Sequence, residues 1–166
     1  HEPFISSAIC QYPGGEQISK EKEKELNMYH MTYQEIKAFD CGSLFNNDFL
    51  LQEKSRVSKP LLTEVLDTVE QVATDKGQLI HYNIELKSQL ALEGIYHPEV
   101  AVFCQVAYQA INHQVDWRRI TIQSFDFRIL RYFNKYYPEV QLALLIENKL
   151  SWELNIDSLG FKPEIY

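Results

Sequence analysis

The sequence predicts an α/β fold in which parallel strands alternate with helices, and two observations lead to this prediction. From residue 60 onward, segments with apolar residues at helical spacing alternate with short segments of β-branched and other apolar residues. The order is helix then strand, repeated along the chain, and strands joined through helices pair in parallel because the chain must cross back over the sheet. This order is typical of a β/α barrel or a doubly wound open sheet.

The first part of the chain, residues 1–59, lacks this alternation. It contains turn signals such as Pro13-Gly14-Gly15 and a single clear helix start. Thr32 is followed three residues later by Glu35, which is the spacing of a capping box, so a short helix is predicted after Thr32 and should end near Asp40. We therefore expect residues 1–59 to form a segment distinct from the regular part.

Three longer helices are predicted from residue 60 on, each with a recognisable start or end. The first begins after Pro60 and should end at Gly77 in a left-handed conformation. The second should carry Pro98 in its first turn, where a missing N–H costs nothing. The third is capped by Asp126 and closed by Pro138. A short helical segment is also predicted near the C-terminus, around residues 152–154.

Three strands are predicted between these helices, over residues 79–87, 119–124 and 140–146. The last is apolar on both faces. The first alternates strictly, and because strand side chains alternate faces, it has one apolar and one polar row. The apolar row is Ile80, Tyr82, Ile84 and Leu86, and the polar row is His81, Asn83, Glu85 and Lys87.

Glu85 and Lys87 stand out because they lie at the carboxyl end of their strand, where both candidate architectures bind ligands. If the apolar row faces the helices, these two side chains face the opposite way. A carboxylate and an ammonium in that position are costly unless they are paired or bound to something. We interpret them as site residues, while a structural salt bridge between them remains the open alternative.

The second strand adds candidates at the same rim. Gln123 and Phe125 share the face opposite Ile120 and Ile122, close to the carboxyl end of the strand. Gln123 either contacts a ligand or forms hydrogen bonds with neighbouring strands, and the sequence leaves both possibilities open. The candidate substrate-binding residues are therefore Lys87, Gln123 and Phe125.

The composition argues against two classes of partner, nucleic acid and the interior of a membrane. A net charge of −7 and a pI of about 5.2 argue against nucleic acid, which requires clustered Lys and Arg. There is no apolar stretch long enough for stable membrane insertion. The oligomeric state is not indicated by any pattern.

The three cysteines, Cys10, Cys41 and Cys104, match no metal-binding spacing and are expected to be partly buried free thiols. Free thiols slightly favour a reducing cytoplasm, but a periplasmic location stays open. Any targeting segment would lie upstream of residue 1.

Two strand motifs together resemble those of the glycerophosphodiester phosphodiesterases. They are Asn83-Ile84-Glu85-Leu86-Lys87 and Ile122-Gln123-Ser124-Phe125-Asp126. His1-Glu2 is similar to that family's His-Asp or His-Glu element, and residues 59–65 are similar to the segment that opens the next helix. The resemblance implies part of a (β/α)8 TIM barrel, with residues 1–59 as a small insertion near the barrel mouth and residues 60–166 as part of the catalytic domain.

The resemblance also implies a reaction and roles for individual residues. The family hydrolyses a glycerophosphodiester to glycerol 3-phosphate and an alcohol with a divalent metal ion, Ca²⁺ or Mg²⁺. By resemblance, Glu85 is a metal ligand, Lys87 approaches the phosphate and His1 is the catalytic acid or base. These residue types suit the reaction, since a phosphodiester needs charge stabilisation and a proton donor for the leaving alkoxide.

The departures from the family pattern imply that the chain is an incomplete part of such an enzyme. The family's His-Arg-Gly element and Glu-x-Asp pair are absent, and only about three barrel strands are predicted. The chain alone is therefore expected to be inactive. A related phospholipase D-like or phosphoinositide-cleaving barrel, and a noncatalytic barrel relative used for binding, remain the alternatives.

Overall fold

The computed structural model describes residues 2–46 and 49–165, and the chain divides into two compact units, His1–Leu61 and Leu62–Tyr166. The division falls close to the predicted boundary between residues 59 and 60. That the first unit is a barrel insertion and the second part of a catalytic domain stays a prediction. The two units are described separately below.

The first unit is built from short elements. It contains the 3₁₀ helices η1 (Glu23–Glu25) and η2 (Met28–His30) and the helix α1 (Tyr33–Ala38). The predicted capping box at the start of α1 is present, because the Thr32 hydroxyl accepts from the Glu35 N–H and the Glu35 carboxylate accepts from the Thr32 N–H at 2.7 Å. A small apolar cluster lies at the centre of the unit and includes Ile5, Cys10, Ile18 and Phe39.

The prediction of three free thiols is wrong for two of them, since Cys10 and Cys41 form a disulfide and Cys104 is the buried free thiol. The cause is a tertiary contact that spacing does not reveal. Gln11 and Asp40 pair antiparallel through two backbone hydrogen bonds of 2.8 and 3.1 Å, which brings the neighbouring cysteines together.

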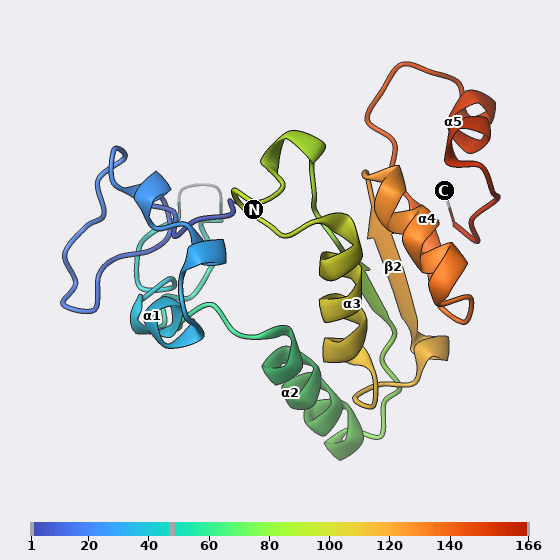
Figure 1. Ribbon diagram of the computed structural model, residues 1–166. Coiled ribbons are helices and arrows are strands. Elements are labelled where there is room, and N and C mark those ends of the chain that lie inside the picture. The colour runs from blue at the N-terminus through green and yellow to red at the C-terminus, as the bar shows by residue number, and fades with distance from the viewer. Residues whose placement is uncertain (1, 47–48, 166) are drawn as a thin grey trace. The chain divides into compact units, whose positions relative to one another are not determined.

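The second unit confirms the predicted alternation of helices and strands (Figure 1). Its strands pair in parallel in the order β1-β2-β3. Its main elements are α2 (Leu62–Asp75), β1 (Tyr82–Glu85), α3 (Val100–Ile111), β2 (Ile120–Ser124), α4 (Phe127–Tyr136), β3 (Gln141–Leu144) and α5 (Trp152–Leu159). The 3₁₀ helices η3 (Leu90–Leu92) and η4 (Trp117–Arg119) lie in the connections that precede α3 and β2.

The strands are shorter than predicted, and one helix start differs. Gly77 follows α2 with a φ of +63°, and the Asp126 side chain caps α4, both as predicted. Pro98, however, is not in the first turn of α3, because Glu99 is the N-cap residue and the helix begins at Val100. Pro98 instead lies in the connection that leads into the helix.

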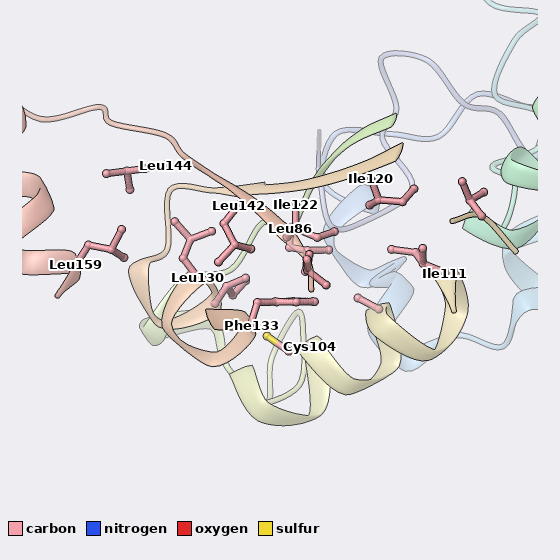
Figure 2. Packing of buried hydrophobic residues seen from close by; sticks show 14 of the residues in the cluster. Leu86, Cys104, Ile111, Ile120, Ile122, Leu130, Phe133, Leu142, Leu144 and Leu159 are labelled. Atoms are coloured by element: carbon pink, nitrogen blue, oxygen red, sulfur yellow. The ribbon is translucent and has the colours of Figure 1, made fainter. Parts of the chain in front are cut away.

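The core of the second unit lies between the sheet and its helices. Figure 2 shows Ile120, Ile122 and Leu142 pointing from the strands toward side chains of α3 and α4. The cluster is completed by residues of α2 and α5, and its members include Leu66, Cys104, Ile111, Leu130, Phe133 and Leu159. The helices thus cover one face of the sheet, as expected for a wall of a barrel.

The opposite face of the sheet carries mainly polar side chains. Asn83, Thr121 and Gln141 lie on neighbouring strands there, and the Thr121 hydroxyl donates to the Gln141 amide oxygen at 2.8 Å. Beyond β3, Ile165 forms a parallel bridge with Ala143. In the part of the chain that the structure describes, no helix has the length and hydropathy to span a membrane.

Candidate active site

Glu85 and Lys87 lie together at the carboxyl end of β1, on the face away from the helices. Their neighbours Ile84 and Leu86 pack into the apolar cluster, so the alternation of the strand directs Glu85 and Lys87 to the other side. The Lys87 ammonium contacts Glu85 Oε1 at 2.7 Å, with side-chain exposures of 48% for Lys87 and 22% for Glu85. The predicted placement is therefore observed, and the alternative of a salt bridge between the two residues is realised in this structure.

Gln123 lies beside Glu85, because the two residues are partners in the parallel register of β1 and β2. Its amide oxygen accepts a hydrogen bond from Asn83 Nδ2 at 2.9 Å. This is the interstrand hydrogen bond that the sequence left open as the alternative to ligand contact. The Gln123 side chain thereby gains a fixed orientation on the polar face.

Phe125 follows directly after β2 and is 46% exposed, so an apolar ring is available at this rim. Glu85, Lys87 and Gln123 come from neighbouring strand ends, and Phe125 completes the predicted group. His1, the predicted catalytic acid or base, lies outside the described residues.

The described residues do not form a complete metal site by themselves. Within residues 2–46 and 49–165, no group of three His, Cys, Asp or Glu side chains is arranged to hold a metal ion. Glu85 supplies one carboxylate on the polar face, whereas Ca²⁺ and Mg²⁺ take six or more oxygen ligands. Any ion bound through Glu85 would need further ligands from elsewhere.

A hydrogen-bond network next to Glu85 and Lys87 was not apparent from the sequence. Ser88 Oγ donates to Asp126 Oδ2 at 2.6 Å, and Arg128 joins Asp126 to Glu93 through contacts of 2.6 Å to each. Burial favours a higher pKa for Asp126, but the hydrogen bonds from Arg128 and Ser88 outweigh burial and lower that pKa. Of this network, only the capping role of Asp126 follows from sequence, because its other members are brought together by contacts of 35 and 38 residues in separation.

A second network lies at the amino-terminal end of the sheet. Glu70 of α2 accepts from Arg119 at 2.6 Å and from the Tyr82 hydroxyl at 2.6 Å. Burial and then the adjacent Glu70 carboxylate raise the pKa of Tyr82 to about 12. Arg119 also donates to the carbonyl of Ile80 at 3.1 Å, so this network joins a helix to the starts of β1 and β2.

Comparisons with known proteins, by sequence and by structure, find similarity to the same protein family. The model of the glycerophosphoryl diester phosphodiesterase family matches residues 15–159. A glycerophosphodiester phosphodiesterase of Bacillus altitudinis is 29% identical over 138 residues, and the match covers 81% of this chain and 49% of that protein.

Two crystal structures share the fold. One is of a Silicibacter pomeroyi DSS-3 protein assigned as a glycerophosphoryl diester phosphodiesterase, with a TM-score of 0.77, 22% identity, and coverage of 97% of this chain and 57% of that one. The other is of a glycerophosphodiester phosphodiesterase from Parabacteroides distasonis ATCC 8503, with a TM-score of 0.50, 16% identity, and coverage of 82% and 47%. The chain thus spans about half the length of the relatives it matches.

Proposed function

Because the chain belongs to the glycerophosphoryl diester phosphodiesterase family, we propose that it is part of an enzyme that hydrolyses a glycerophosphodiester to glycerol 3-phosphate and an alcohol. One observation carries the proposal. Glu85, Lys87 and Gln123 lie together on the polar face, at the carboxyl ends of two parallel strands. In barrels this end of the sheet holds the catalytic groups.

Lys87 would bind the phosphate of the substrate. Its side chain is half exposed and lies at the rim, so a phosphoryl oxygen can replace water around the ammonium. A positive charge at this position favours the negative charge that develops as the diester is cleaved. Gln123 would then contact the polar part of the substrate through its amide, and the exposed ring of Phe125 would pack against carbon atoms of the substrate.

Glu85 would be one ligand of a divalent ion, either Ca²⁺ or Mg²⁺. Its carboxylate is partly exposed at the same rim as Lys87. Glu85 would need further oxygen ligands, and the catalytic acid or base would be His1, which lies outside the described residues. We accordingly expect the 166-residue chain alone to lack appreciable activity, and robust metal-dependent turnover by this chain would contradict that expectation.

The test uses the longest natural form of the protein with glycerophosphocholine as substrate and either Ca²⁺ or Mg²⁺ present. We expect Lys87→Met to lower the rate about 100-fold, as the loss of one group that stabilises a developing charge does. Lys76→Met is the matched control, because Lys76 is exposed at the end of α2, and it should retain wild-type activity. A Lys87→Met protein with an unchanged rate would overturn the assignment.

A lipid-bearing phosphodiester is the second candidate substrate. The first unit exposes three consecutive apolar side chains, Phe49, Leu50 and Leu51, and Leu51 is 98% exposed. Exposed apolar groups of this kind suit an acyl chain. If the substrate is a lipid, replacing all three residues by Ser should raise the KM for lysophosphatidylcholine and leave that for glycerophosphocholine unchanged. Equal effects on both substrates, or none on either, would reject this candidate.

The Cys10–Cys41 disulfide leads us to propose an oxidising compartment, such as a periplasm, instead of a reducing cytoplasm. Trapping free thiols in intact cells tests the proposal. We expect Cys104 to be labelled as a free thiol and Cys10 and Cys41 to be protected, whereas labelling of all three residues would place the protein in a reducing compartment.

A further inference from the structure

The pairing between β1 and β2 continues beyond the last residue of β1 through one backbone hydrogen bond and two hydrogen bonds from serine side chains. The Leu86 N–H donates to the Gln123 carbonyl at 2.9 Å, and the Leu86 carbonyl accepts from the Ser124 hydroxyl at 2.7 Å. Two residues further on, Ser88 Oγ donates to Asp126 at 2.6 Å. The residues on both sides of Lys87 are therefore tied to the junction between β2 and α4.

This junction is itself held rigidly. The fully buried Ser124 hydroxyl accepts from the Asp126 N–H at 3.0 Å, and Asp126 accepts from the Arg128 N–H at 3.0 Å as the cap of α4. The Arg128 guanidinium binds both oxygens of the Asp126 carboxylate and reaches Glu93 in the loop after β1. Bidentate pairs of this type fix orientation as well as distance. Ser88 is thus attached to an acceptor that has little freedom to move.

The ion pair with Glu85 does not by itself explain why Lys87 should hold one position. Exposed ion pairs are weak, and Lys87 is half exposed. A lysine side chain also has many rotamers, so its preferred position depends on the direction in which the backbone aims it. That direction is set at Lys87 by the anchors on Leu86 and Ser88.

We propose that Ser88 and Asp126 are positioning residues, which fix the backbone around Lys87 so that its ammonium stays at the rim beside Glu85. The restriction of the backbone around Lys87 follows from the hydrogen bonds of Leu86, Ser88 and Asp126. The consequence for phosphate recognition rests on the proposed function, because it takes Lys87 as the residue that binds phosphate.

The first experiment measures the mobility of the Lys87 side chain by NMR relaxation of its methylene groups in the longest natural form of the protein. Ser88→Ala removes a hydroxyl from a half-buried residue and should lower the order of the Lys87 side chain to that of the exposed Lys149. Ser88→Thr, which keeps the hydroxyl, should restore the wild-type order. Ser151→Ala is the matched control, since it removes a hydroxyl that caps α5 and should leave Lys87 unchanged. Wild-type Lys87 order in Ser88→Ala would overturn the proposal.

The second experiment titrates the same proteins with glycerol 3-phosphate and follows the Lys87 signals. We expect Ser88→Ala to weaken binding by up to about tenfold, the cost of immobilising one long side chain at the moment of binding. If glycerol 3-phosphate leaves the wild-type Lys87 signals unchanged while Ser88→Ala still loosens Lys87, the phosphate role fails and the positioning role stands. If the wild type binds and Ser88→Ala binds equally well, the positioning role fails and the phosphate role stands.

Discussion

At both ends of the three-stranded sheet, an arginine joins oxygen atoms from different elements. At the amino-terminal end, Arg119 binds Glu70 of α2 and the carbonyl of Ile80. At the carboxyl-terminal end, Arg128 binds Asp126 at the start of α4 and Glu93 in the loop after β1. At both ends the guanidinium binds one carboxylate through two hydrogen bonds, but its further partner and the elements that are joined differ.

Because the two networks join different elements, we expect one of them to stabilise the fold and the other to maintain the geometry of the candidate site. The amino-terminal network connects a regular helix with the starts of two strands, far from the rim where Glu85 and Lys87 lie. The carboxyl-terminal network connects an irregular loop with a strand–helix junction at that rim. In barrels the amino-terminal end serves stability and the carboxyl-terminal end carries the site. We therefore expect disruption of the first network to affect mainly unfolding, and disruption of the second to affect mainly the local order of the rim.

The largest effect on stability is expected from Arg119→Met. This change leaves Glu70 without its charged partner and removes the donor to Ile80, so the free energy of unfolding should fall by about 2 to 3 kcal/mol, the range for hydrogen bonds to charged groups. Urea unfolding measures the change. Arg118→Met is the matched control and should have little effect, because Arg118 is 89% exposed and pairs with its near neighbour Asp116. Increased mobility of Lys87 in Arg119→Met would contradict the separation of the two ends.

Arg128→Met should cost somewhat less stability, about 2 kcal/mol, because the Asp126 cap of α4 and the hydrogen bond from Ser88 remain. Its local consequence should be larger than that of Arg119→Met. Amide hydrogen exchange between residues 88 and 97 should accelerate, since Glu93 loses its link to α4. Unchanged exchange in this loop would show that Arg128 does not hold it.

Tyr82→Phe should have a smaller effect, about 1 kcal/mol, because Glu70 keeps both contacts with Arg119 and loses only the phenol donor. Urea unfolding again provides the measurement. In a double variant with Arg119→Met, the two losses should not add, since both residues bind the same carboxylate. Simple additivity would show that Tyr82 and Arg119 act separately.

The smallest expected effect on the free energy of unfolding comes from the protonation of Glu70 at low pH. Hydrogen bonds from Arg119 and then Tyr82 hold the pKa of Glu70 below its ordinary value. A lowered pKa in the folded state means that ionised Glu70 stabilises the fold fully above its unfolded pKa of about 4, and that this contribution is lost as the pH falls through the lowered value. Arg119→Met should therefore flatten the acid decline of unfolding free energy below about pH 4. Arg56→Met, with an exposed arginine of the first unit, should follow the wild-type decline.

Most of the second unit could be predicted from the sequence, because its helices and strands follow from the spacing of apolar residues and from the residues at their ends. The alternation in residues 80–87 identified which face of β1 meets the helices, and Gly77 and Asp126 marked helix boundaries correctly. Pro98 was placed wrongly, since proline suits both the first turn of a helix and the residues just before it.

The candidate site was predictable only in part. Glu85, Lys87 and Gln123 could be placed at one rim, because parallel strands in register bring their carboxyl ends together. The roles of Ser88, Glu93 and Arg128 could not be predicted, since no periodicity connects residues in a loop with residues in a later helix.

By itself, the sequence determined the α/β order, the apolar and polar faces of β1 and the caps at the starts of α1 and α4, because each depends on residues that are neighbours along the chain. Only the tertiary structure decided the pairing of Cys10 with Cys41 and the anchoring of the rim around Lys87. The physical reason is the same in both cases. A disulfide and a side-chain hydrogen bond each require two atoms within a few ångströms, and for residues far apart in sequence that proximity is set by the packing of the whole unit.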